Sequence, residues 1–396
     1  STIIRMAQSF VGANNMALLE PLGQFGTRLL GGDDAASARY VYTRLSALAR
    51  LLFPEDDHEV LTYRTDDGFS IEPEWYAPII PLVLVNGCKG IGTGWSVDVP
   101  MYHPYDIIEN IVCLMEGKTM SPMFPWARGF QGSFEMDNAG NWKSRGKIER
   151  ISKEKLCILE LPLYRWTEPY RSFLSSLLDS GKVRGFSEMH TDSTINFEIT
   201  MEPKEIEDLC SSPSGLESFF RLQNSIPTKM MNLFDERGEL RNYAGPLEIL
   251  QAFYPVRLEV YHKRKNAKVV QLESQLKRHR NRLRFVDDVI RGSMQVSGVP
   301  LSIMLSTLHA RGYDRLPSSD NSPVGQSGFK YLVDIPLWQL TSEKVSELRT
   351  ATDTLSQSLE HVYRQSVEDL WRVDLEKLQG FLAHDESYRR VGPCRI

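Results

Sequence analysis

Cysteine is scarce in this 396-residue sequence, which contains five, and no two of them lie close together. They are Cys88, Cys113, Cys157, Cys210 and Cys394. Zinc sites usually place cysteines two to four residues apart, and small disulfide-rich domains repeat them at short intervals, so the spacing excludes both. The pattern favours a reducing, intracellular compartment.

The sequence also lacks a long apolar run, a leader peptide and an excess of positive charge. Its longest apolar stretch, residues 79–85, is far shorter than the roughly 18 residues of a membrane-spanning helix. It begins Ser1-Thr2-Ile3-Ile4, without Met or a basic-then-apolar leader, so we expect no signal peptide and a piece of a longer protein. The net charge of −5, from 46 Lys and Arg against 51 Asp and Glu, argues mildly against a protein that coats nucleic acid.

Familiar catalytic motifs are missing as well: there is no G-x-S-x-G elbow, no H-E-x-x-H zinc pair and no Walker loop ending in Gly-Lys-Ser/Thr. Residues 90–94 (GIGTG) look like a phosphate-binding loop. They lack the dinucleotide frame and a following Lys, so a tight turn between strands is the main interpretation. Asp56, Asp57 and His58 could hold a metal, but adjacent acids on a turn after a helix are usually solvated.

Apolar periodicity predicts an α+β protein. The elements expected in the first 245 residues are a helix at 40–53, a strand at 59–63, a turn at 66–68, a helix at 105–115 and strands at 155–163 and 194–201.

Two heptad stripes predict a long antiparallel helical hairpin. The first covers 258–290, with Leu, Val or Ile at seven of ten positions, and the second covers 345–362. Ser366 and Asp369 form a capping-box-like pattern that starts a further helix through Leu382. Residues 257–291 hold eleven Lys and Arg against four Asp and Glu (+7), and 343–383 hold five against eight (−3), so opposite charges weakly favour pairing. A flexible loop is expected at 318–327.

A glycine-rich stretch ends in a pair of residues suited to phosphoryl chemistry, Arg39-Tyr40. A phenol is a poor nucleophile at neutral pH, but a neighbouring guanidinium would stabilise both the phenolate and a pentavalent phosphoryl transition state. The pair therefore suggests tyrosine attack on a phosphodiester. The alternative is that Tyr40 is a half-buried aromatic at the start of a helix.

Two long segments carry a family resemblance: LLEPLGQFGTRLLGGDDAASARYVYTRLSALARLLFPEDD and IEPEWYAPIIPLVLVNGCKGIGTGW. They closely resemble the breakage–reunion region of eukaryotic-type DNA topoisomerase II, a type IIA enzyme, and weaker similarity covers nearly the whole chain. The resemblance implies a multidomain α+β fold. Its implied parts are a winged-helix remnant (1–100), a mixed α/β tower domain (101–245), an outgoing coiled-coil arm (246–291), a small helical dimer-gate tip (292–342) and a returning arm with a C-terminal tail (343–396).

The resemblance also implies roles for individual residues. Tyr40 matches the tyrosine that links covalently to a DNA 5′-phosphate, Arg39 matches the arginine that assists it, and Ile91 matches an isoleucine that wedges between base pairs. Weaker matches imply DNA contacts at six further residues, of which Gln8 borders the cleavage and drug site: Gln8, Asn14, Asn15, Gln24, Thr27 and Arg28. Asp33 departs from the family pattern, which has Lys there, and Ala38 replaces a usual Pro.

Neither the Glu-Gly-Asp-Ser-Ala loop nor the Asp-x-Asp-x-Asp run of the family's magnesium-binding Toprim domain occurs in this sequence, and neither does the ATPase module. We therefore expect no metal site in the chain, Mg²⁺ and ATP bound by other domains of the intact enzyme, and little or no cleavage by this polypeptide alone. Expected partners are double-stranded DNA, a second copy of the chain and the Toprim and ATPase modules, with no membrane. The expected location is the nucleus, although organellar and viral enzymes share these motifs.

Two alternatives remain open. One is a non-catalytic DNA-binding module with a coiled-coil dimeriser. The other is a tyrosine phosphotransferase of another family, such as a recombinase, which needs several Arg and His around its Tyr. The arginines we consider within range of Tyr40 in sequence are Arg28, Arg39 and Arg44.

Overall fold

The computed structural model describes residues 1–191, 193–213, 215–317 and 327–389. The chain divides into two compact units, Ser1–Val260 with Trp371–Ile396, and Tyr261–Leu370. Helices and strands are mixed throughout the first unit, and helices make up the second. Within the described ranges, no helix combines the length and the apolar character needed to cross a membrane.

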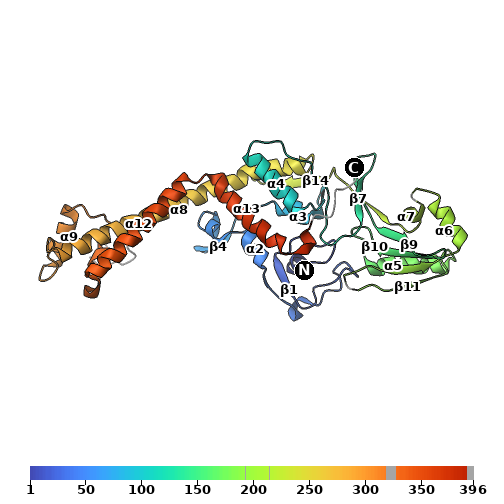
Figure 1. The fold of residues 1–396 in the computed structure, drawn as a ribbon, viewed down its shortest axis with the longest axis horizontal. Coiled ribbons are helices and arrows are strands. Elements are labelled where there is room, and N and C mark those ends of the chain that lie inside the picture. Colours follow the sequence, from blue (N-terminus) through green and yellow to red (C-terminus); the bar gives the residue numbers. More distant parts are fainter. Residues whose placement is uncertain (192, 214, 318–326, 390–396) are drawn as a thin grey trace. The chain divides into compact units, whose positions relative to one another are not determined.

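The first hundred residues form short helices and three antiparallel two-stranded ribbons, β1–β2, β3–β4 and β5–β6 (Figure 1). The elements are α1 (Thr2–Ala7), β1 (Leu19–Leu22), η1 (Ala38–Tyr40), β2 (Tyr42–Leu45), α2 (Ala47–Leu52), η2 (Glu55–Asp57), β3 (Tyr63–Asp66), β4 (Phe69–Pro73), α3 (Leu82–Asn86), β5 (Cys88–Gly92) and β6 (Trp95–Val99).

The helix predicted over 40–53 is wrong in its first half. Residues 42–45 pair with β1 instead, with Tyr42 opposite Leu22, and the helix begins only at Ala47, where the Ser46 hydroxyl accepts a hydrogen bond from the Ala49 N–H. The strand predicted at 59–63 is wrong except for its last residue, because residues 58–60 form a turn and β3 begins only at Tyr63. The predicted turn at 66–68 is confirmed as the tip of β3–β4.

Residues 104–245 form the mixed part of the first unit, with a four-stranded sheet in the order β11-β12-β10-β9 and a three-stranded sheet in the order β13-β8-β7. The elements are α4 (Pro104–Met115), β7 (Ser133–Met136), β8 (Trp142–Arg145), β9 (Lys147–Arg150), β10 (Lys155–Glu160), α5 (Thr167–Asp179), β11 (Gly185–Glu188), β12 (Phe197–Thr200), α6 (Pro203–Cys210), α7 (Gly215–Phe219), β13 (Gln223–Ile226), β14 (Met231–Phe234) and β15 (Leu240–Tyr243). α5 buries Tyr170, Leu174 and Leu177 in the same core as Ile158 and Phe197 of the sheet. The predicted helix at 105–115 and both predicted strands are confirmed, the strands in shortened form.

The remaining elements are mostly helical: α8 (Pro246–Ile290), α9 (Leu301–Ala310), α11 (Lys330–Val333), η3 (Leu337–Gln339), α12 (Ser342–Arg364), α13 (Val367–Ala383) and η4 (Glu386–Tyr388). In the second unit α8 and α12 run antiparallel, because Lys265 donates to the Gln365 carbonyl at 2.6 Å while α8 residues further along meet the start of α12 (Figure 1). The capping box is confirmed, since the backbone N–H of Ser366 and of Asp369 each donates to the side chain of the other at 3.0 Å. Apart from Ser327, the loop predicted at 318–327 lies outside the described residues.

Candidate active site

Tyr40 lies at an exposed junction between two elements. It ends η1, where its N–H donates to the Ser37 carbonyl at 2.9 Å, and β2 begins two residues later. Its side chain is 67% exposed, so the interpretation of a half-buried aromatic is wrong. The guanidinium carbon of Arg39 lies 4.9 Å from the centre of the Tyr40 ring. The sequence-predicted pair is therefore brought together at the surface, where a phenol can reach a phosphodiester and a cation stands beside it.

The loop that leads to this pair, residues 23–37, is closed by its own hydrogen bonds. The Asp34 carboxylate accepts from the Thr27 hydroxyl at 2.6 Å and from the Thr27 N–H at 2.8 Å. The Ala36 N–H donates to the Gln24 carbonyl at 2.9 Å. The hydroxyl and the N–H of Thr27 are thus both hydrogen-bonded within the loop, whereas the Gln24 side chain is exposed and can reach a ligand. The contact of either with DNA stays a prediction.

Two glycines explain why the loop can fold so tightly. Gly26 has φ +92°, and a Cβ there would lie 2.6 Å from the backbone of Gly32. Gly31 has φ +65°, and a Cβ there would lie 2.3 Å from the indole of Trp166. Side chains at either position would be strained and would collide, so glycine is required. Trp166 was not singled out from the sequence, because it lies more than a hundred residues away along the chain.

Gln8 supports this loop directly, and the partly buried Asn14 bonds to the segment that carries Gln8. The Gln8 amide is buried and donates to the carbonyls of Phe25 at 2.8 Å and Gly32 at 3.3 Å. Asn14 donates to the Gln8 carbonyl at 2.9 Å and to the Arg5 carbonyl at 2.7 Å. These contacts fix the loop's inner edge, so a direct contact of either side chain with DNA stays a prediction that this geometry does not support.

Asn15 connects segments that are distant in sequence. Its buried amide donates to the carbonyls of Val85 at 2.8 Å and Trp126 at 3.2 Å and accepts from the Arg128 N–H at 2.8 Å. Its own carbonyl accepts from the Tyr388 hydroxyl at 2.6 Å. Burial raises the pKa of Tyr388, so this phenol remains a proton donor at neutral pH. We expected Asn15 to face DNA, but every polar group of its side chain is bonded within the protein.

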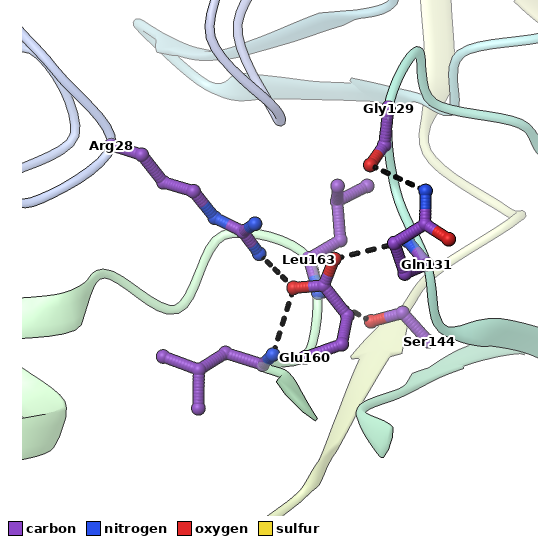
Figure 2. Close-up of polar contacts among 7 residues, drawn as sticks. Arg28, Gly129, Gln131, Ser144, Glu160 and Leu163 are labelled. Carbon is purple, nitrogen blue, oxygen red and sulfur yellow. Dashed lines mark hydrogen bonds and ion pairs between the residues drawn. The ribbon is translucent and has the colours of Figure 1, made fainter. Parts of the chain in front are cut away.

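Arg28 is buried in an ion pair with Glu160, at the end of β10. Figure 2 shows the guanidinium directed at this carboxylate, which also accepts from the backbone N–H groups of Leu161 at 2.8 Å and Gln131 at 3.0 Å. The pair ties the glycine-rich loop to the neighbouring sheet. It leaves Arg28 no exposed surface from which to bind phosphate, contrary to the expectation from sequence. Glu160 was missed, although a single acid in the apolar run LCILELPL could have indicated a buried partner.

Ile91 lies near the tip of the β5–β6 ribbon. Gly92 pairs with Trp95 across a two-residue turn, in which Gly94 has φ +82°. The interpretation of 90–94 as a tight turn between strands is therefore confirmed. The Ile91 side chain is 94% exposed. An apolar side chain is therefore held on a narrow ribbon and left almost wholly in water.

One of the three possible metal ligands at residues 56–58 has a structural role. Asp57 is buried and pairs with Arg257 of α8 at 2.7 Å, so it is not the solvated acid that we expected. Across the part of the chain that the structure describes, no group of three His, Cys, Asp or Glu side chains is arranged to hold a metal ion.

Comparison with known proteins identifies the class. Residues 1–376 match the model of the DNA gyrase/topoisomerase IV family, in its A-subunit form, and the chain belongs to that family. It is 37% identical to DNA topoisomerase 2-alpha of Sus scrofa and of Homo sapiens, over 99% of this chain and 28% of each relative. It is 35% identical to DNA topoisomerase 2 of Arabidopsis thaliana over 96% of this chain and 28% of that relative.

A solved structure gives the same assignment. The Plasmodium falciparum topoisomerase II DNA-binding, cleavage and re-ligation domain superposes with a TM-score of 0.86 and 35% identity, covering 97% of this chain and 55% of that chain. In sequence and fold the chain therefore corresponds to the cleavage and re-ligation core of a type II topoisomerase. It spans 28% of the length of the mammalian and plant relatives named above.

Proposed function

We propose that this chain cleaves and religates DNA as part of an ATP-dependent type II topoisomerase. The Tyr40 phenol loses its proton and attacks a backbone phosphorus, forming an O–P bond to the tyrosine and releasing the 3′-hydroxyl of the broken strand. Attack by that hydroxyl on the phosphotyrosine reverses the step, so no bond energy is lost. The exposed Tyr40 with the Arg39 guanidinium 4.9 Å from its ring supports this proposal most directly.

Arg39 would stabilise the charge that develops in this step. The pentavalent transition state is more negative at its oxygens than the diester, and a guanidinium beside it favours the transition state over the bound substrate. Mg²⁺ held by carboxylates of a Toprim domain would add further stabilisation of this charge.

Ile91 would insert between base pairs and bend the cleaved segment. Unstacking one step costs roughly a few kcal/mol, which the extra surface contacted by bent DNA offsets. An exposed apolar side chain on a stiff ribbon suits that purpose, because it has no packing within the protein to lose.

The proposed oligomeric state, domain boundaries and location are supported by the family and by the helical second unit. We propose a homodimer that cuts both strands through its two Tyr40 residues and passes a second duplex, with ATP bound by an ATPase module. Residues 1–100 would be the winged-helix-like region, 101–245 the tower domain, 246–291 and 343–396 the coiled-coil arms and 292–342 the gate tip. The proposed location is the nucleus.

The test is a Tyr40→Phe variant in the enzyme that combines this chain with its Toprim and ATPase modules. Reactions on duplex DNA are stopped with detergent, and covalent protein–DNA adducts are separated from free DNA. With wild-type enzyme, a label on the 3′ end of the cut strand should migrate with the protein, whereas a 5′ label should be released. Tyr40→Phe should abolish the adduct, and Tyr63→Phe, which removes the hydroxyl of a β3 tyrosine, should retain it.

Adducts that persist in Tyr40→Phe would place the nucleophile elsewhere. If even the wild-type enzyme formed no adduct while binding DNA, a non-catalytic DNA-binding module would replace the proposed function. The chain on its own should show little or no cleavage, because no metal-binding cluster is found among its described residues.

A further inference from the structure

Tyr42 is an exposed aromatic side chain next to the candidate nucleophile that the function described so far leaves unused. It is the first residue of β2, and its side chain is 75% exposed, more than that of Tyr40. Leu22, directly opposite on β1, is also exposed. Among the described residues, the Tyr42 side chain makes no hydrogen bond and no ring contact. Its ring therefore adds nothing visible to the packing of the ribbon.

The side chains around Tyr42 alternate between aromatic and cationic groups. Residues 39–44 read RYVYTR, with two arginines and no acid. Arg39 lies over the Tyr40 ring, and Arg44, two residues after Tyr42, reaches Glu20 on β1 at 2.5 Å while remaining largely exposed. Exposed aromatics interleaved with arginines are typical of surfaces that bind single-stranded nucleic acid, on which unpaired bases stack along the phosphate backbone.

Position along the strand specifies which nucleotides Tyr42 can reach. Two residues of extended chain span about 7 Å, and nucleotides of one DNA strand rise by about 3.4 Å each. If the scissile phosphate lies at Tyr40, the Tyr42 ring can reach nucleotides within about two positions of the break. A protein partner would have to cover Tyr42 without displacing this DNA, so DNA is the occupant that the position favours.

We propose that Tyr42 stacks on the sugar or base of a nucleotide beside the scissile phosphate and helps to select the sequences that are cut. This inference rests on the proposed function, since it places the scissile phosphate at Tyr40. Tyr42 would be a specificity-determining residue: it does not take part in bond exchange, but its stacking energy differs between neighbouring bases.

The experiment compares Tyr42→Ala and Tyr42→Phe in the enzyme that carries the Toprim and ATPase modules. Cleavage positions are mapped at nucleotide resolution on a pool of random duplexes, and KM and kcat for cleavage are measured on one preferred duplex. Tyr42→Ala should raise KM about tenfold and flatten base preference within two nucleotides of the break, because stacking is lost. Tyr42→Phe keeps the ring and should keep both the preference and KM.

Phe69→Ala is the matched control, since Phe69 lies on β4 with the same exposed fraction of 75%. It should leave cleavage positions and KM unchanged. Because Tyr42 is unpacked, all three variants should unfold at the wild-type temperature, which separates the effect from misfolding.

An unchanged cleavage pattern and KM in Tyr42→Ala would overturn the inference. So would an unchanged pattern accompanied by weaker binding of a separately supplied Toprim module, which would make that module the occupant. Both outcomes differ from failure of the proposed function, in which adducts would no longer depend on Tyr40.

Discussion

The predicted site residues divide into two regions with opposite environments. Tyr40 and Ile91 lie at the ends of narrow ribbons with most of their side chains in water, whereas Gln8, Asn15 and Arg28 are buried and each bonds to groups inside the protein. All five come from motifs of the same family resemblance. A motif near a reactive residue can therefore reflect the shape of a loop as well as contact with the substrate.

Substitutions in the exposed and the buried region should differ in their effect on the free energy of unfolding. Replacing an exposed side chain removes chemistry with little effect on folding, but replacing a buried polar side chain leaves its partners unsatisfied. Unfolding measurements on a variant of a buried residue and a matched variant of an exposed residue therefore test whether the two regions differ in this way.

The largest loss of stability is expected from Arg28→Ala. It would leave the Glu160 carboxylate buried and without its cation, at a cost of about 3–5 kcal/mol in the free energy of unfolding. Urea unfolding followed by tryptophan fluorescence measures it. Arg44→Ala is the matched control, because it breaks an exposed Arg–Glu pair that contributes about 0–1 kcal/mol. Equal losses in the two variants would remove the distinction between the two regions.

A smaller loss is expected from Asn15→Ala. The carbonyls of Val85 and Trp126 and the N–H of Arg128 would lose their partner, which we expect to cost about 2–4 kcal/mol in the same unfolding experiment. Asn14→Ala, one residue earlier and only partly buried, should cost about 1 kcal/mol. If Asn15→Ala kept full stability and lost only DNA affinity, Asn15 would be a DNA contact after all.

The smallest effect on folding is expected from Ile91→Ala, within about 0.5 kcal/mol of wild type, since its side chain is almost wholly exposed. Its effect should appear in the DNA instead. Fluorescence resonance energy transfer between dyes on the two ends of a bound duplex should report a straighter duplex than with wild type. A duplex bent as strongly as before would show that Ile91 is not the wedge.

Sequence patterns predicted the local features of the fold well. The heptad stripes correspond to α8 and α12, and the Ser366–Asp369 capping box was confirmed bond for bond, because both depend on residues a few positions apart. The helix expected at 40–53 failed in its first half, because pairing with β1, about twenty residues earlier, overrides local helical spacing.

The reactive residues of the candidate site were predictable from the sequence, but the buried contacts that hold the site in place were not. The Arg39-Tyr40 pair stands out in sequence because the two residues are adjacent. Arg28 pairs with Glu160, which lies 132 residues later, and the Tyr388 hydroxyl bonds to Asn15 across 373 residues. No local sequence motif could therefore have indicated either contact. A residue that contacts DNA and a buried structural residue differ in the direction of their side chains. That direction is known only from the folded structure.

The role of Tyr40 as the nucleophile is tested most directly by identifying the residue that is covalently linked to DNA. Adducts trapped on duplex DNA would be digested with nuclease and trypsin, and the peptide Tyr40–Arg44, which contains both Tyr40 and Tyr42, would be sequenced by tandem mass spectrometry. We expect a 5′-linked nucleotide on Tyr40 and an unmodified Tyr42. A nucleotide on Tyr42, or on any residue outside this peptide, would contradict it.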